Sequence, residues 1–174
     1  MIDILEERDD WYEKYKSIWL AHYHETGETK WDIYPRPDNK TAPAGKAVDL
    51  SKSRLLLITS AGGFLKASQK RFDDENDLGD YTLRTFPTST ALSELAFAHT
   101  HYDHQAVDED PQVLVPLRHL EDMVREGIIG ELTENVITFC GYMPDMGRVI
   151  DELIPAILEI ANAERSHAAL LVPA

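Results

Sequence analysis

Short apolar runs alternate with stretches of helical spacing over most of this chain. Three runs, 55–59, 135–140 and 168–172, are too short for helices and predict buried strands. Stretches 113–127 and 147–163 carry apolar residues three and four positions apart, as in helices. Because strands alternate with helices, we expect an α/β fold: a single domain with a mostly parallel central sheet and helices on both faces.

The rest of this body has weaker patterns. Residues 66–80 are polar and rich in acidic side chains, which predicts a loop. Residues 81–86 alternate and predict a further strand, and 90–98 can form a short helix or turn. Gly127 is placed to end the helix predicted before it.

An amphipathic helix with an aromatic stripe precedes the body. The spacing predicts it over residues 3–24, and the prolines that follow predict a surface arm. We therefore expect three parts: an N-terminal helix (1–34), a proline-rich arm (35–52) and the α/β domain (53–174). An exposed stripe of this size would favour aggregation, so we expect it to be buried against the body or a second subunit, with a homodimer favoured. Its members are Trp11, Tyr15, Ile18 and Trp19.

Composition and charge exclude several classes of partner and location. The net charge of −14 argues against nucleic acid or an anionic membrane as a partner, because both require a basic surface. No apolar run approaches the roughly 20 residues of a membrane span, and the acidic N-terminus lacks a secretory signal. The single cysteine excludes an internal disulfide framework, which favours the cytoplasm.

A turn rich in small residues follows the first predicted strand. Thr59 and Ser60 would direct hydroxyls into the crevice where strands end, and Gly62 and Gly63 would let a ligand approach the backbone. Successive N–H groups there could hold an anion. A tight turn without a ligand is at least as good an interpretation, since no complete phosphate-binding spacing is present.

The densest chemical cluster is the segment 99–104. It contains three imidazoles and a carboxylate, groups that can transfer protons, bind substrate or hold a metal. In extended geometry His99, His101 and Asp103 share one face, whereas His104 points elsewhere. Catalysis or substrate binding and a purely structural role are equally supported. A metal site ranks below both, and we expect neither metal nor other cofactor.

Cys140 lies between a predicted strand and a predicted helix, with Tyr142 close behind. A helix N-terminus could lower the pKa of this thiol and make it nucleophilic. Buried, inert cysteines are more common, so that alternative is favoured.

Four segments in this order resemble one family. They are 57–63, 99–103, 115–117 together with 127–130, and 141–145. The chain, over about residues 53–174, resembles the selenoprotein B family of glycine, sarcosine, betaine and D-proline reductases. The resemblance implies reductive C–N cleavage of a small amino acid or its N-methyl derivative, with a redox partner protein. The candidate catalytic residues are His99, His101, Asp103 and Cys140, and the candidate substrate-binding residues are Thr59, Ser60, Gly62, Gly63 and Tyr142.

The resemblance also implies a selenocysteine or cysteine directly after a strand like 168–172, whereas this sequence stops at Ala174. We expect the coding frame to continue past a UGA codon there; a short homologue with another role and a truncation are the alternatives. Three functions follow: a subunit or truncated form of such a reductase, a non-redox binding or scaffolding subunit, and a metal-dependent enzyme using 99–104.

Overall fold

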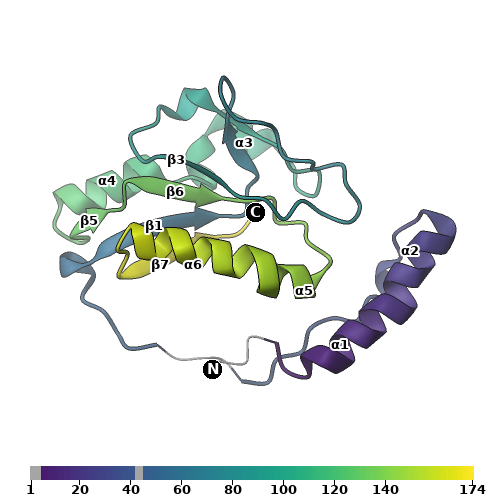
Figure 1. Cartoon of the computed structure of the whole chain (residues 1–174). Helices are drawn as coiled ribbons and strands as arrows, with labels where there is room; N and C mark the ends of the chain where they lie inside the picture. The colour runs from purple at the N-terminus through teal and green to yellow at the C-terminus, as the bar shows by residue number, and fades with distance from the viewer. Residues whose placement is uncertain (1–4, 42–44) are drawn as a thin grey trace.

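A five-stranded sheet forms the centre of the computed structural model, which describes residues 5–41 and 45–174 (Figure 1). Strand β1 (Arg54–Thr59) is its central strand. Along one side β1 pairs in parallel with β7 (Ala168–Val172), and on the other with β5 (Glu131–Leu132) and then β6 (Asn135–Thr138). The three strands that the sequence predicts are thus parallel, and their carboxyl ends share one edge of the sheet.

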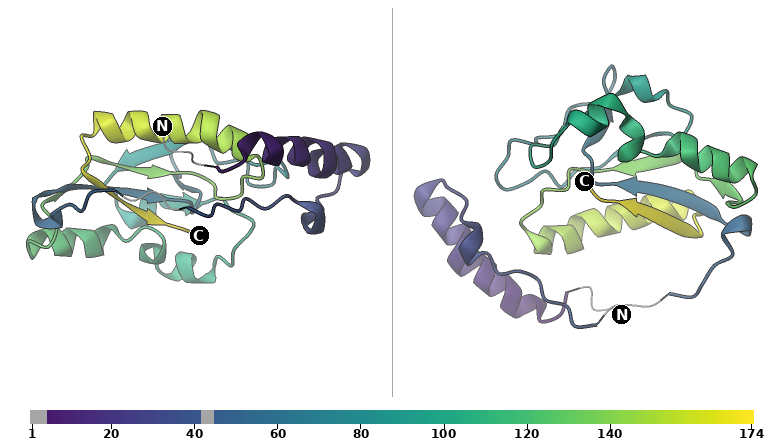
Figure 2. Two further views of the ribbon diagram at one scale, coloured as in Figure 1. Left: turned by 90° about the horizontal axis from the view of Figure 1, so that it is seen from below. Right: turned by 180° about the vertical axis from the view of Figure 1, so that it is seen from behind.

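Alternating side chains of β1 face two apolar layers. Leu55 and Leu57 belong to the cluster packed under α4 (Leu117–Arg125). Leu56 and Ile58 belong to the cluster packed under α6 (Ile154–Ala163). Burial on both faces explains why β1 is a continuous apolar run. Figure 2 shows α4 and α6 on opposite sides of the sheet, which confirms the predicted α/β fold.

Strand β3 (Arg84–Pro87) closes one edge of the sheet, antiparallel to β6. It begins later than the predicted strand at 81–86, because Tyr81 is buried in the preceding loop. There its hydroxyl accepts a hydrogen bond of 2.7 Å from the N–H of Asp145. The segment 66–80 has no helix or strand, as predicted.

A second, two-stranded sheet joins β2 (Gly63–Leu65) and β4 (Leu95–Phe97) in antiparallel pairing. The predicted helix or turn at 90–98 is in part the 3₁₀ turn Leu92–Glu94, and in part β4. Three-residue strands have too few positions to show a periodicity, so this sheet was missed. Its pairing depends on segments that are distant in the sequence.

Short helices complete the α4 side of the molecule. Helix α3 (Gln105–Glu109) and the 3₁₀ turn Pro111–Val113 lead into α4, whose predicted start at 113 was therefore too early. Gly127 ends α4 as predicted: its φ is +74°, and its N–H donates to the carbonyl of Val124.

The predicted helix at 147–163 is one continuous run with a wide turn inside it. It comprises α5 (Met146–Arg148), a π-helical turn (Val149–Leu153) and α6. Pro155 accounts for the wide turn, because a proline ring clashes with the carbonyl four residues earlier in a regular α-helix.

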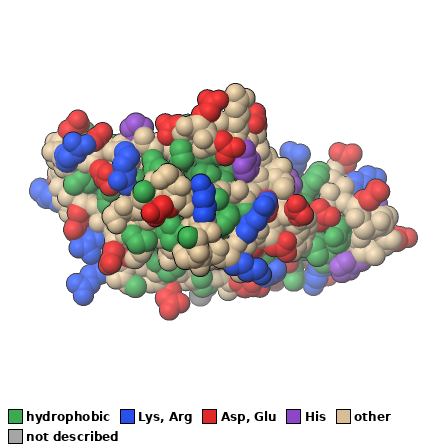
Figure 3. Space-filling model, turned by 90° about the horizontal axis from the view of Figure 1, so that it is seen from above, with side chains coloured by type: hydrophobic (Ala, Val, Ile, Leu, Met, Phe, Trp, Pro, Cys, Tyr) green, Lys and Arg blue, Asp and Glu red, His purple; other side chains and the backbone are tan. Residues whose placement is uncertain are grey.

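The N-terminal helix projects from the sheet body (Figures 1 and 3). It comprises α1 (Arg8–Lys14), a π-helical turn (Tyr15–Leu20) and α2 (Ala21–Thr26); residues 3 and 4 of the predicted helix and 42–44 of the arm lie outside the described residues. A 3₁₀ turn, Trp31–Ile33, follows it, and another, Leu50–Lys52, precedes β1.

Three aromatic residues of the stripe are buried, but Ile18 is not. Trp11, Tyr15 and Trp19 pack in a cluster that includes Met146 of α5. Ile18 is 47% exposed on the single chain, so the body does not cover it, and its burial against a second subunit stays a prediction. The contact stripe follows a spacing of four residues, and Ile18 lies one position, about 100°, away from it.

Strand β7 differs from the prediction in its surroundings. The sequence predicts a buried strand, whereas β7 lies at the edge of the sheet and its side chains alternate between intermediate and exposed, with Leu171 68% exposed. Ala168 and Leu170 pack against the α4-side cluster, while Leu171 faces outward on the other side. An apolar run therefore predicted the strand correctly but not its position in the sheet.

Candidate functional site

The segments that follow β1, β6 and β7 meet at the carboxyl edge of the sheet. The N–H of Ala174 donates a hydrogen bond of 2.9 Å to Ser60 Oγ. A Cβ atom built on Gly141 would lie 3.1 Å from Ser60 Oγ and 3.2 Å from His99 Nε2. Ser60, Gly141, His99 and Ala174 therefore surround one point, which is the convergence expected where parallel strands end.

The turn after β1 uses its own N–H groups internally. Those of Ala61 and Gly63 donate to the hydroxyls of Thr59 and Thr138, at 3.3 and 3.0 Å. Those of Ser60 and Gly62 donate to the carbonyls of Val172 and Phe139. These four donors are not free for an anion, so the structure favours the tight-turn interpretation.

Gly62 is required by the close approach of two backbones. Its φ is +67°, and an added Cβ would lie 2.1 Å from the carbonyl oxygen of Ala98. The N–H of Ala98 in turn donates to the carbonyl of Gly62 at 2.9 Å. This contact fixes His99, the next residue, beside the turn.

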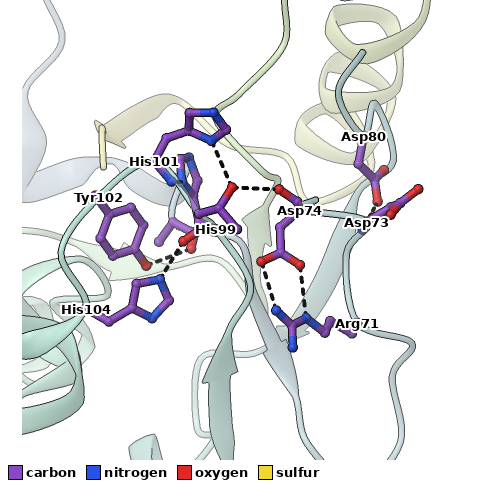
Figure 4. A network of polar contacts seen from close by, with 10 residues as sticks. Arg71, Asp73, Asp74, Asp80, His99, His101, Tyr102 and His104 are labelled. Carbon is purple, nitrogen blue, oxygen red and sulfur yellow. Dashed lines mark hydrogen bonds and ion pairs between the residues drawn. The ribbon is translucent and has the colours of Figure 1, made fainter. Parts of the chain in front are cut away.

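Two histidines of the cluster present opposite hydrogen-bonding groups (Figure 4). His99 Nδ1 accepts the N–H of His101 at 3.1 Å, so Nε2 carries the proton of the neutral ring. The hydroxyl of Thr100 donates to the carbonyl of Asp74 at 2.8 Å and must therefore accept from His101 Nδ1, 3.1 Å away. Neutral His101 is left with a lone pair on Nε2.

Burial controls the charge of His99. The residue is 6% exposed, and burial lowers its pKa below 6.5, helped by the nearby His101 and His104 and opposed by Asp74. His99 is therefore neutral at pH 7 and acts as an N–H donor. His101 is exposed.

The remaining ring of the cluster and its tyrosine are structural. His104 Nε2 donates to the carbonyl of His99 at 2.6 Å, and its ring stacks on Tyr102 with centroids 4.5 Å apart. The hydroxyl of Tyr102 donates to the carbonyl of Ala61 at 3.0 Å, and burial raises its pKa. Together they bind the histidine loop to the turn after β1.

Two predicted catalytic residues lie in less suitable places. The carboxylate of Asp103 is exposed and accepts the N–H of Gln105 at 2.9 Å, which stabilises the start of α3. Cys140 is 1% exposed, and burial raises the pKa of its thiol. A buried, protonated thiol is a poor nucleophile, so the structure favours the inert interpretation of Cys140.

Sequence reasoning missed an ion pair that supports this site. Asp74 is 5% exposed, and both of its carboxylate oxygens accept from Arg71, at 3.0 and 2.9 Å (Figure 4). Burial is the largest single influence and pushes the pKa of Asp74 upward. The hydrogen bonds and charge of Arg71, a backbone hydrogen bond and the nearby His104 together outweigh it and hold the pKa below its usual range. The three-residue spacing was visible in the sequence, but the acidic residues around it concealed which carboxylate is buried.

The geometry gives no support to a metal centre. Among the described residues, no three His, Cys, Asp or Glu side chains are arranged to hold a metal ion.

Fold and geometry together define an α/β protein with a polar site at the carboxyl ends of parallel strands. The sequence pattern of the glycine/sarcosine/betaine reductase selenoprotein B family matches residues 26–148. The match covers more than half of the chain, and the chain belongs to this family.

Curated relatives carry related names. D-proline reductase subunit gamma of Acetoanaerobium sticklandii is 29% identical over 123 residues, 71% of this chain and 49% of the relative. Two proteins of Peptoclostridium acidaminophilum are each 31% identical: sarcosine reductase complex component B subunit beta over 70% of this chain, and glycine reductase complex component B subunit gamma over 61%.

The matched regions span only 28% and 25% of those last two relatives. This chain therefore corresponds to a quarter to a half of the curated relatives. No solved structure matches it significantly. Within residues 5–41 and 45–174, no helix has the length and apolarity to cross a membrane.

Proposed function

We propose that this chain is the substrate-binding part of a selenoprotein B-type reductase, acting in reductive C–N cleavage of a small amino acid or N-methylated amino acid. One observation carries the proposal: His99 Nε2–H and the hydroxyl of Ser60 converge where β1, β6 and β7 end. Family membership and the names of the relatives support the reaction class. A second protein of the complex would be its redox partner.

The residues near this point have complementary roles in the proposal. His99 donates a hydrogen bond to the substrate carboxylate without adding a charge, because its ring is neutral. His101 accepts or returns a proton at Nε2, and the Ser60 hydroxyl orients the substrate. Tyr142 borders the site; burial raises its pKa to about 12, so it stays protonated.

The nucleophile of the proposed reaction is a thiolate or selenolate placed beside Ser60. It would attack the substrate carbon, forming a bond from sulfur or selenium to carbon, while the C–N electron pair leaves with the amine, which takes up a proton. A thiolate of the redox partner would then attack the sulfur or selenium and break its bond to carbon, and the carbon would take up a proton to give the reduced product. The disulfide or selenylsulfide left behind would be reduced by a second thiol of that partner. Cys140 is unsuited to the first step. The hydrogen bond of 2.9 Å from the N–H of Ala174 to Ser60 Oγ supports this placement beside Ser60.

A binding or scaffolding subunit without redox chemistry is the second candidate. The observation in its favour is that the single cysteine of the chain is buried and protonated. Such a subunit would keep the same substrate contacts but leave the chemistry to another protein.

Calorimetric titration of the purified chain with glycine, sarcosine, betaine and D-proline tests the proposal. We expect one of them to bind, and His99→Ala or Ser60→Ala to weaken binding at least about tenfold, the value of one or two hydrogen bonds. His119→Ala, an exposed histidine on α4, is the control and should bind normally. Absence of binding, or binding insensitive to His99 and Ser60, would contradict the proposal.

The reactivity of a thiol added after Ala174 separates the two candidates, because the binding-subunit candidate expects it to react like free cysteine. With a dithiol donor the chain alone should bind substrate without cleaving it. Adding a cysteine after Ala174 should restore a thiol that iodoacetamide alkylates faster than free cysteine at pH 7, and His99→Ala should slow that reaction. Cleavage by the unmodified chain that Cys140→Ser abolishes would overturn both assignments.

A further inference from the structure

We infer that Trp31 and Tyr142 are positioning residues for His101, so that the N-terminal segment forms part of the site. The relevant contacts run from Trp19 in the N-terminal helix through Trp31 and Tyr142 to His101. We refer to these four residues as the aromatic chain. The inference deepens the proposed function and rests on it for the role of His101, but the contacts themselves do not depend on that role.

The last contact of the aromatic chain is the closest. The rings of His101 and Tyr142 stack with centroids 3.8 Å apart and an interplanar angle of 7°. His101 is exposed; the hydrogen bond of its ring is that from Nδ1 to Thr100, and the edge contact with His99 is more distant, at 5.8 Å between centroids. The face of Tyr142 therefore determines in which direction the free Nε2 of His101 points.

Tyr142 is itself held from several sides. Its hydroxyl donates to the carbonyl of Asp77 at 3.1 Å. A Cβ atom on Gly79 would lie 2.7 Å from the carbonyl oxygen of Tyr142, so the loop before β3 is pressed against its backbone. The edge contact with Trp31, with centroids 5.7 Å apart and an angle of 77°, is the contribution of the N-terminal segment.

Trp31 is anchored in turn by the N-terminal helix. Its ring lies 5.3 Å from that of Trp19, which is fully buried, and 5.1 Å from that of Tyr34. The hydroxyl of Tyr34 donates to the carbonyl of Pro144 at 2.8 Å, which ties this segment to the loop containing Tyr142. The N-terminal segment and the 141–145 loop thus form one packed unit next to the histidines.

This arrangement gives the N-terminal helix a role beyond stability. Shortening Trp31 leaves the sheet and both apolar layers untouched, because Trp31 is 42% exposed and belongs to neither layer. It removes the ring contact behind Tyr142, together with those to Trp19 and Tyr34. The inference therefore separates an effect on His101 from an effect on the fold.

The test is the NMR signal of the His101 ring in the full-length chain. Stacking on Tyr142 shifts the ring protons of His101 upfield. We expect Trp31→Ala to move them downfield, toward their position in the denatured chain, and to weaken any substrate binding about tenfold, while the circular dichroism spectrum is retained. Trp31→Phe keeps an aromatic edge and should restore both readings.

The control is Tyr12→Ala, which removes an exposed ring of the N-terminal helix that stacks on Trp11 and Tyr15. It should leave the His101 signal in place. If Trp31→Ala does not fold, Tyr142→Leu replaces it, with the same downfield shift expected. An unchanged His101 signal in the folded variant overturns the inference. If the signal moves but the parent chain binds none of the amino acids, the positioning stands and the proposed function fails.

Discussion

Gly62 shows how one residue can fix the site. Its left-handed backbone and its contact with the carbonyl of Ala98 leave no room for a side chain. We expect Gly62→Ala to destabilise the protein by about 2–5 kcal/mol, from backbone strain plus overpacking. Gly127→Ala is the matched control: its φ of +74° is similar but nothing lies within 4 Å, so only about 1–2 kcal/mol should be lost. Urea denaturation measures both; equal losses would contradict the close approach.

His99 makes stability depend on pH. Burial is the main cause that holds the pKa of His99 below 6.5, and the nearby His101 and His104 add to it. Between the native pKa and 6.5 the unfolded chain therefore binds a proton at this ring, whereas the native state does not. Stability should therefore fall as the pH decreases from about 7 through 6.5 toward the lower native pKa. In His99→Gln this contribution to the pH dependence of stability should disappear, whereas in His119→Gln it should persist. Denaturation midpoints between pH 5 and 7.5 measure it, and identical slopes in parent and His99→Gln would refute this account.

At the scale of elements, the N-terminal helix is stabilised by an aromatic stack. Trp11, Tyr15 and Trp19 follow one another at four-residue spacing, with ring centroids 5.1 and 5.6 Å apart. A helix that projects from the body could not bury these rings by itself, and the cluster is completed by Tyr34, Leu78 and Met146. Its stability therefore depends on the body.

We expect Trp19→Ala to cost about 3–5 kcal/mol, because the side chain is fully buried. Ile18→Ala, one position away and 47% exposed, should change stability by less than about 0.5 kcal/mol. Thermal unfolding followed by tryptophan fluorescence and circular dichroism compares the two. A large loss from Ile18→Ala would mean that a partner, such as a second copy, covers this face in solution.

At the scale of the whole molecule, the net charge of −14 destabilises the folded state, because the like charges repel one another. Most ion pairs among the described residues join exposed side chains three or four positions apart, such as Lys14–Asp10, and contribute little. We therefore expect the melting temperature to rise between 0.02 and 0.3 M NaCl, as repulsion is screened. Glu25→Gln and Glu28→Gln, both at exposed positions, should raise it at low salt and reduce the response. A fall in melting temperature with salt would show that attractive pairs dominate.

The sequence by itself determined the elements whose patterns are local. Continuous apolar runs predicted β1, β6 and β7, because a strand buried on both faces or joined in parallel contains little else. Helical spacing predicted α4 and α6, and Gly127 marked the end of α4. The grouping of Ser60 and Tyr142 near one edge followed from the rule that parallel strands end together, whereas His99 follows β4 of the small antiparallel sheet.

Only the tertiary structure decided which of these residues are available for chemistry. The hydroxyl of Thr59 and the N–H groups of Gly62 and Gly63 are engaged in internal hydrogen bonds, and Cys140 is buried. The tautomer of His101 depends, through Thr100, on the carbonyl of Asp74, a residue 27 positions before His101. The position of β7 at the sheet edge and the contact of Trp31 with Tyr142 likewise depend on partners far away in the sequence. Local patterns record what each segment prefers, whereas burial and hydrogen bonding are set by neighbours that only the folded chain brings together.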